Sequence, residues 1–224
     1  MKKKFPYLDV KTRFSFPPIE SATPEGIVAV GGNLSPGMLI SAYSQGIFPW
    51  FGKNDPVIWW SPDPRFVLYP EKLHISKSLA GLISKGRFEV KFNTRFREII
   101  DGCRKSSRPM QSGTWITEEM VDAYMKLFEL GYVYSAAVIE KESSRLAGGV
   151  YGIKIGRCYF GESMFYNVKN ASKYGFAVLV KQLEKEGVEI IDCQVETEHL
   201  KRFGAEMIPR KIFIDTIKEL ADDF

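Results

Sequence analysis

Three polar side chains interrupt apolar stretches that otherwise suit the interior of a sheet: the carboxylates Glu162 and Asp192 and the amide Gln194. Because successive side chains of a strand alternate between its faces, Asp192 and Gln194 should share a face with Val188 and Ile190. A carboxylate that continues an apolar face must be hydrogen-bonded or paired. The three groups are therefore candidates for orienting reactants and moving protons. The plainer alternatives are that Glu162 faces water in a hairpin and that Asp192 caps the following turn.

The glycine pattern predicts the elements that position these groups. Four glycines fall within nine residues of the segment Leu146–Asn170, among valine, isoleucine, tyrosine and phenylalanine residues. The segment predicts two antiparallel strands, about 145–154 and 157–165, joined by a short turn at Ile155–Arg157. Glycine weakens a strand, so its repetition indicates a bulge or a ligand pressed against the backbone.

The Pro62–Arg65 turn marks the expected domain boundary, which divides the chain into residues 1–66 and residues 67–224. The first part should be a small α+β domain with one helix over 36–45. The second part should contain, in order, a helix ending at Gly86, a strand at 88–92, helices capped by Thr94 and Thr117, strands at 133–140, 145–154 and 157–165, a helix at 171–186, a strand at 188–194, a helix at 197–203, a strand near Met207 and a helix at 210–221. This order predicts an α+β fold whose larger domain has a mixed sheet flanked by helices.

The charge is concentrated in one part of the chain. The 31 basic and 27 acidic residues leave a net charge of +4, whereas residues 71–110 alone hold ten basic and four acidic residues, a net of +6. Such a segment suits a phosphate backbone, although a solubilising surface is the bland alternative. The candidates for backbone contacts are Lys85, Arg87, Arg104, Lys105 and Arg108.

The cysteine and histidine content excludes several site classes. Three widely spaced cysteines and two histidines predict neither a disulfide framework nor a metal site. Because no apolar run is long enough to cross a bilayer, we expect no membrane association. These features together suit a reducing cytoplasm.

Several unusual strings recur in order from about residue 15 to residue 215. They are GIFPWF (Gly46–Phe51), WWSPDPR (Trp59–Arg65), GTWIT (Gly113–Thr117), GGVYGIKIGRCYFGESMF (Gly148–Phe165), NASK (Asn170–Lys173) and IDCQ (Ile191–Gln194). In these blocks the chain resembles the leucyl/phenylalanyl-tRNA–protein transferase family. The match covers nearly the whole chain, and WWSPDPR and GESMF make it specific.

The resemblance implies an enzyme that moves leucine or phenylalanine from aminoacyl-tRNA to the N-terminal Arg or Lys of acceptor proteins, which marks them for N-degron-dependent degradation. It also implies an N-acetyltransferase-like fold for the larger domain, and we expect a monomer. No cofactor is expected, because Asn167–Lys173 stands where acetyltransferases carry the glycine-rich loop that holds a pyrophosphate. The donor bond is already an ester, so no serine or cysteine nucleophile activated by histidine is required.

Matching the family's positions residue by residue implies roles at the site. The resemblance assigns the aminoacyl side-chain pocket to Val150, Tyr159 and Leu179, and the rings that hold the terminal adenine to Trp50 and Trp115. For the reaction we expect Gln194 to hydrogen-bond the amine or the oxyanion, Asp192 to orient Gln194, and Glu162 to hold the α-amino group or a water. Proton removal is left open between Asp192, water and the ribose. Asp192→Ala is expected to abolish transfer with the fold intact.

Two other function classes stay open at this point. One is a coenzyme A-dependent N-acetyltransferase, which binding of acetyl-coenzyme A would favour. The other is a non-catalytic tRNA-binding module, which would bind tRNA and transfer nothing.

Overall fold

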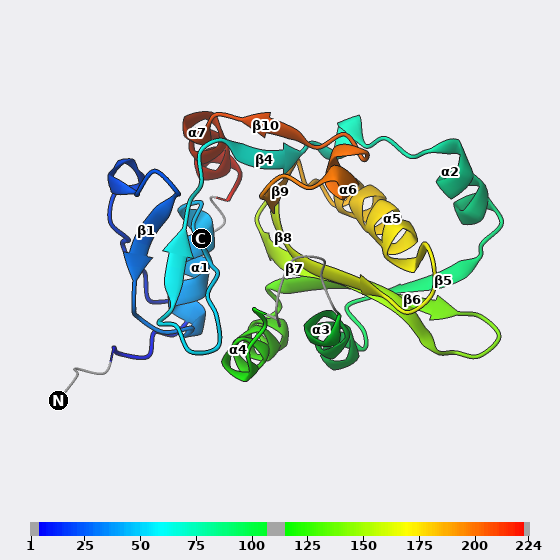
Figure 1. Ribbon diagram of the computed structural model, residues 1–224, viewed down its shortest axis with the longest axis horizontal. Coiled ribbons are helices and arrows are strands. Elements are labelled where there is room, and N and C mark those ends of the chain that lie inside the picture. Colours follow the sequence, from blue (N-terminus) through cyan, green and yellow to red (C-terminus); the bar gives the residue numbers. More distant parts are fainter. Residues whose placement is uncertain (1–4, 107–114, 222–224) are drawn as a thin grey trace.

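The computed structural model describes residues 5–106 and 115–221, and it divides into a small sheet and a large sheet (Figure 1). The small antiparallel sheet has the strand order β1-β3-β2. Its elements are a 3-10 turn (Ile19–Ser21), β1 (Ile27–Val30), α1 (Pro36–Ser44), β2 (Phe48–Pro49) and β3 (Ile58–Trp60).

The large sheet has the strand order β10-β4-β9-β8-β7-β6-β5. Its strands are β4 (Arg65–Leu68), β5 (Phe88–Phe92), β6 (Val133–Glu140), β7 (Leu146–Ile155), β8 (Cys158–Tyr166), β9 (Ile190–Gln194) and β10 (Glu206–Ile208). Neighbouring strands are antiparallel except β8 and β9, which run parallel, so the sheet is mixed. A parallel pair needs a crossover, and here α5 supplies it.

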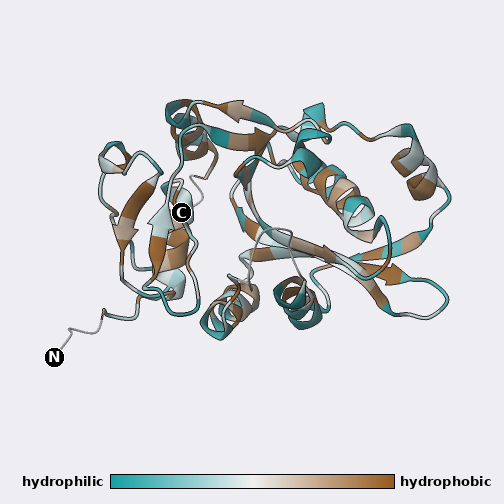
Figure 2. Cartoon of the chain, viewed as in Figure 1, coloured by the Kyte–Doolittle hydropathy of each residue, from teal (hydrophilic) through white to brown (hydrophobic). Residues whose placement is uncertain are grey.

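Helices cover both faces of the large sheet. They are a 3-10 turn (Pro70–Lys72), α2 (Lys77–Ser84), α3 (Phe96–Lys105), α4 (Glu118–Glu129), α5 (Ala171–Lys185), α6 (Glu198–Lys201) and α7 (Arg210–Leu220). α5 packs on β6 and β7 from one side, and α3 packs on β7 and β8 from the other. Hydrophilic residues lie along the outer sides of α3 and α4 (Figure 2). This arrangement confirms the predicted α+β fold with a mixed sheet flanked by helices.

Of two helix caps predicted from the sequence, one is present in the structure and the other is not. The hydroxyl of Thr117 accepts a hydrogen bond from the Met120 N–H at 3.2 Å, which is the predicted cap of α4. Thr94 is not the cap of α3, because α3 follows Arg95, whose backbone is left-handed at φ 56°. The Arg95 guanidinium pairs with Glu98 in the first turn of the helix.

Helices lie close against two glycines of β7. A Cβ on Gly149 would lie 2.9 Å from Ile99 of α3, and a Cβ on Gly148 would lie 3.0 Å from Ala171 of α5. Because neighbouring residues of a strand face opposite sides, the two glycines admit one helix on each face.

One hydrophobic cluster runs through both parts of the chain. It joins Tyr43 and Trp59 of the small part to Phe160 of β8 and to Phe213 of α7. The division at residue 66 therefore stays a prediction. Within the described ranges, no helix is both long and apolar enough to span a membrane.

Gly46→Ala should weaken the packing of α7 against the small part of the molecule. Gly46 has φ +72°, and a Cβ there would overlap Ile214 and approach Phe213. Gly131 is the matched control, because its φ is +83° and its Cβ would meet nothing within 4 Å. Both substitutions carry a backbone cost of about 1 kcal/mol. Gly46→Ala should add a steric cost of about 1–3 kcal/mol, measured by denaturant unfolding. Equal losses at the two positions would contradict tight packing of α7 at Gly46.

Candidate functional site

The cavity of the site opens where the two parallel strands separate. The pairing of β8 with β9 ends at Phe160 and Asp192. Beyond that point the strands enclose a cavity of about 720 Å³, which residues 48–50 of the small part help to line. The end of a parallel strand pair is where ligand crevices occur in α/β sheets.

A β-bulge on each strand turns a polar side chain into this cavity. Tyr151 pairs with Ser163 and Gly152 pairs with Gly161, so Glu162 is the extra residue on β8. The register of β9 against β4 shifts in the same way at Cys193. Bulges re-aim side chains beside functional sites.

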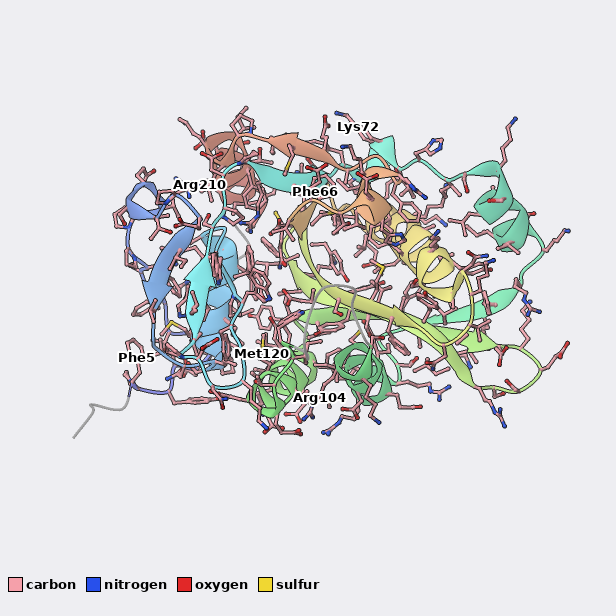
Figure 3. The ribbon with its side chains drawn as sticks, viewed as in Figure 1. Phe5, Phe66, Lys72, Arg104, Met120 and Arg210 are labelled. Atoms are coloured by element: carbon pink, nitrogen blue, oxygen red, sulfur yellow. The ribbon has the colours of Figure 1, made fainter. Side chains whose placement is uncertain are left out.

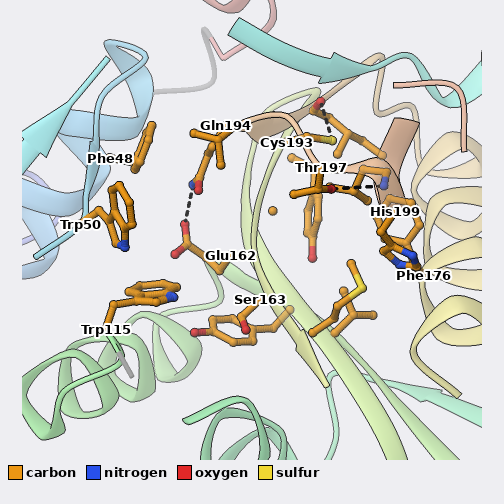
Figure 4. Close-up of a pocket in the computed structure, with 18 of the residues that line it drawn as sticks. Phe48, Trp50, Trp115, Glu162, Ser163, Phe176, Cys193, Gln194, Thr197 and His199 are labelled. Carbon is orange, nitrogen blue, oxygen red and sulfur yellow. Dashed lines mark hydrogen bonds between the residues drawn. The ribbon is translucent and has the colours of Figure 1, made fainter. Parts of the chain in front are cut away.

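The two re-aimed side chains meet in the cavity. The Gln194 amide Nε2 donates to Glu162 Oε1 at 3.3 Å, as the dashed line in Figure 4 shows. Both residues line the cavity wall.

The backbone of Gln194 departs from the strand conformation. Its φ is +64°, and the Val195 N–H donates to the Cys193 carbonyl at 2.8 Å across it, which makes a γ-turn. A residue other than glycine in this region carries a conformational cost, and such residues cluster at functional sites. The expectation that Asp192 and Gln194 share a face is wrong, because the bulge and this turn interrupt the strand's alternation.

Asp192 lies behind the cavity wall and forms a buried ion pair. Its carboxylate accepts two hydrogen bonds from Arg65, from Nε at 2.8 Å and from Nη2 at 2.7 Å, and both side chains are 1% exposed. Its Oδ1 also accepts the Gln194 backbone N–H at 2.9 Å. Asp192 is not among the residues that line the cavity. Its placement suits the orienting role expected of it, and does not suit direct proton removal.

Glu162 is held by two buried tyrosines from distant helices. Tyr43 of α1 donates to Oε1 at 2.7 Å, and Tyr124 of α4 donates to Oε2 at 2.9 Å. Burial raises the pKa of the Glu162 carboxyl to about 7, although both tyrosine hydrogen bonds act to lower it. Neither tyrosine was a predicted site residue, and no spacing relates them to Glu162 in the sequence.

Aromatic rings line one end of the cavity. Trp50, which is 39% exposed, and Trp115 both line it, together with Phe48. Trp60 supports Trp50 from outside, because its indole Nε1 donates to the Trp50 carbonyl at 2.7 Å. Figure 4 shows the Trp50 and Trp115 side chains on the same side of Glu162.

The other end of the cavity is mostly apolar, and Figure 4 shows Thr197 and His199 there beside Phe176. Val150 and Tyr159, which the resemblance assigns to the aminoacyl side-chain pocket, line the cavity, and so does Phe176 of α5, which was not predicted. Leu179 is fully buried but is not a lining residue, so its assignment to the pocket wall is wrong. Phe176 precedes Leu179 by three residues on the same helix, and this helical spacing was the signal that could have found it.

The predicted basic residues do not form a single patch. Lys85 and Arg87 follow α2, which contacts α5 on one face of the sheet, whereas Arg104 and Lys105 end α3 on the other face. Arg104 forms an ion pair with Glu118. Lys72, from the same basic segment, lies on the opposite side of the molecule from Arg104 (Figure 3). Arg108 lies outside the described residues.

The arrangement suits an elongated ligand with a flat ring at one end and an apolar group at the other. Polar groups stand between the two ends. Burial raises the pKa of the Cys193 thiol well above its ordinary value, so this cavity-lining group is no ready nucleophile. In the part of the chain that the structure describes, no three potential metal ligands come together.

Comparison with known proteins identifies related sequences. The model of the family described as leucyl/phenylalanyl-tRNA protein transferase matches residues 67–218, and the model of that family's N-terminal domain matches residues 32–63. A leucyl/phenylalanyl-tRNA–protein transferase of Myxococcus xanthus is 48% identical over 90% of this chain and 86% of its own. Relatives of the same name from Anaeromyxobacter sp. and Pseudomonas putida are 49% and 47% identical, over 93% of this chain and 88% and 92% of theirs.

Solved structures are more distantly similar. L-PGS from Bacillus licheniformis superposes with a TM-score of 0.44 and 9% identity, over 71% of this chain and 64% of that chain. A GCN5-related N-acetyltransferase from Sphaerobacter thermophilus gives 0.39 and 12%, over 84% and 59%. Nothing about the chemistry of this chain follows from likenesses at this level.

Asp192→Ala should destabilise the protein by about 3–5 kcal/mol in denaturant unfolding, because it leaves the Arg65 guanidinium buried without a counter-charge. This prediction differs from the sequence-based expectation that the fold stays intact, because the sequence did not show the ion pair with Arg65. Glu206→Ala is the control, because it removes a surface ion pair with Lys72 and should cost less than about 1 kcal/mol. The double substitution Arg65→Met with Asp192→Leu should recover most of the loss. A loss at Asp192 no larger than that at Glu206 would contradict a structural ion pair.

Proposed function

Since the chain belongs to the leucyl/phenylalanyl-tRNA–protein transferase family, we propose that it moves leucine or phenylalanine from aminoacyl-tRNA to the N-terminal amine of an acceptor protein. The observation that carries this function is the order of groups along one cavity. Two tryptophans lie at one end, an apolar pocket lies at the other, and Glu162 and Gln194 stand between them. The 3′ end of a charged tRNA has the same order: adenine, ester and amino-acid side chain.

The two ends of the cavity hold the donor. Trp50 and Trp115 offer rings on which the terminal adenine stacks, an interaction of about 1–3 kcal/mol per base. Val150, Tyr159 and Phe176 surround the apolar side chain. A donor held at both ends places its ester beside Glu162 and Gln194.

The polar middle of the cavity aligns the reaction. The acceptor amine attacks the ester carbonyl carbon, a C–N bond forms, and the bond from that carbon to the ribose oxygen breaks. The Gln194 amide is placed to hydrogen-bond the developing oxyanion or the amine. Asp192 acts as a positioning residue, because it holds the Gln194 backbone N–H and is itself fixed by Arg65.

The body of the tRNA and the acceptor lie outside the cavity. We assign the contacts with the tRNA phosphate backbone to Arg104 and Lys105 in preference to Lys85 and Arg87. Arg104 pairs with Glu118 of α4, and α4 is the helix that follows Trp115. Acceptors that begin with Arg or Lys, the marking of these acceptors for degradation, a monomeric state and a cytoplasmic location complete the proposal. They rest on the family alone.

A transfer assay tests the function directly. Leucyl-tRNA and a peptide that begins with Arg should give a peptide one leucine longer, whereas a peptide that begins with Glu should stay unchanged. Gln194→Ala should lower the rate by about 10²–10³. Gln182→Ala is the control, because this amide bonds Glu186 on the surface and lies away from the cavity. Absence of transfer by the folded wild-type protein would overturn the proposed function.

Val150→Phe should change the choice of donor. The added ring fills part of the apolar pocket, so phenylalanine transfer should fall relative to leucine transfer by about 1–3 kcal/mol, or roughly 5- to 150-fold. The measurement is the ratio of leucine to phenylalanine transferred to one peptide. Leu179→Ala is the control: it should cost about 2–5 kcal/mol in stability. It should leave the ratio unchanged, since Leu179 does not line the cavity. An unchanged ratio in Val150→Phe would remove Val150 from the pocket.

A further inference from the structure

Two phenol oxygens beside the cavity form a closed ring of three short contacts with the Glu162 carboxyl. Tyr43 Oη lies 2.7 Å from Glu162 Oε1, Tyr124 Oη lies 2.9 Å from Glu162 Oε2, and the two phenol oxygens lie 2.5 Å apart. Each distance is that of an O–H···O hydrogen bond. A hydrogen bond needs one hydrogen atom between its two oxygens, so the ring needs three.

The two phenols supply only two hydrogens. Both tyrosines are fully buried. Burial, and after it the charge of Glu162, raises the pKa of each phenol well above its ordinary value, so neither supplies a negative oxygen. With an ionised Glu162, one of the three contacts would bring two oxygens together with no hydrogen between them. A proton on Glu162 provides the third hydrogen and completes the ring.

We propose that Glu162 is a neutral carboxylic acid in the resting site, and that its ionised form takes the proton from the attacking amine. Tyr43 and Tyr124 are positioning residues that set the pH at which this form becomes available. The inference rests on the proposed function for its second half only. The state of the resting ring stands on the three contacts and on the neutral phenols, without the proposed function.

The proton balance of the transfer closes on this group. When the neutral amine attacks the ester carbon, its nitrogen must lose one proton as the C–N bond forms, and the Glu162 carboxylate accepts it. When the C–O bond breaks, the ribose oxygen needs one proton to leave as a hydroxyl, and the Glu162 carboxyl returns it. Glu162 is ionised before and after the transfer, and no other reactant is consumed.

The groups that face Glu162 come from four elements. When Glu162 is ionised, Tyr43 of α1, Tyr124 of α4 and the Gln194 amide of β9 can each donate it a hydrogen bond, which favours the carboxylate. Burial and the charge of Asp192 disfavour it and prevail, so the pKa of Glu162 stands at about 7. Tyr159, on the same strand as Glu162, is buried and neutral, because burial raises the pKa of its phenol well above its ordinary value.

The state of the resting ring is tested on the free protein. A pH-difference infrared spectrum of the wild type should show a carboxylic-acid carbonyl band that titrates near pH 7 and is missing in Glu162→Gln. Surface carboxyls titrate about two or more pH units lower and serve as the internal reference. A wild-type spectrum without such a band above pH 6 would overturn the proton count.

Thermal unfolding gives a second measurement that needs no substrate. The pKa of Glu162 is higher in the fold than in the unfolded chain, so its contribution to stability is complete at low pH and is lost as the pH rises through about 7. Glu162→Gln has no such loss. Its melting temperature should therefore rise relative to the wild type between pH 5 and pH 8. A constant difference across this range would contradict a shifted carboxyl.

The pH profile of transfer tests the role of the ionised form. kcat/KM should show an acidic limb near pH 7, where Glu162 gains its proton, in addition to the limb set by the acceptor amine, whose ordinary pKa is about 7.7–8.0. Tyr43→Phe and Tyr124→Phe each remove one oxygen of the ring, so each should move this limb away from its wild-type pH. Tyr134→Phe is the matched control, because its hydroxyl bonds Glu186 on the surface and its limb should stay with the wild type.

The outcomes separate this inference from the proposed function. If transfer occurs but neither tyrosine variant shifts the acidic limb of the kcat/KM profile, the proton role of Glu162 is overturned and the proposed function stands. A lower rate with an unmoved limb would show that the tyrosines support only the structure. Absence of transfer would overturn the proposed function and the proton role with it, whereas the infrared band would still decide the state of the ring.

Discussion

The ion pair between Arg65 and Asp192 brings three parts of the molecule to one point. The Arg65 guanidinium lies between the rings of Phe48, at 4.8 Å, and Phe213 of α7, at 4.6 Å. It holds Asp192, and Asp192 holds the turn at Gln194. A buried charge is costly unless its partner is held in good geometry. The small part, the last helix and the end of β9 are therefore fixed relative to one another. The cavity wall at Gln194 is therefore rigid. Because the donor ester is already activated, the enzyme mainly has to orient the reactants, and a rigid wall serves that purpose.

Much of the fold could be predicted because its signals are local. The glycine-rich hairpin, the Thr117 cap and the helix after Asn170 each follow from a few neighbouring residues. The placement of Gln194 could not, since alternation along a strand assumes a regular pleat, and a bulge breaks it without a mark in the sequence. The cap at Thr94 failed for a related reason, because a left-handed residue at Arg95 starts the helix one residue later.

The sequence could predict only those residues of the candidate site that their own neighbouring residues mark. Glu162 and Gln194 were recognised as polar residues in apolar surroundings, and Trp50 and Trp115 through their strings. Tyr43 and Tyr124 are ordinary aromatic positions on their own helices, and only the packing of α1 and α4 against the end of β8 brings them to Glu162. The basic segment failed as a patch because consecutive elements of the chain lie on opposite faces of the sheet.

The packing of α7 against Gly46 has a consequence for the protein during its synthesis. The ribosome delivers the small part first and α7 near the end of the described chain, and domains otherwise fold as their residues emerge. Until α7 emerges, Phe213 does not cover the Arg65 guanidinium, and the β9 turn lacks its full support. The pocket is therefore complete only once α7 has been synthesised and has packed over the Arg65 guanidinium.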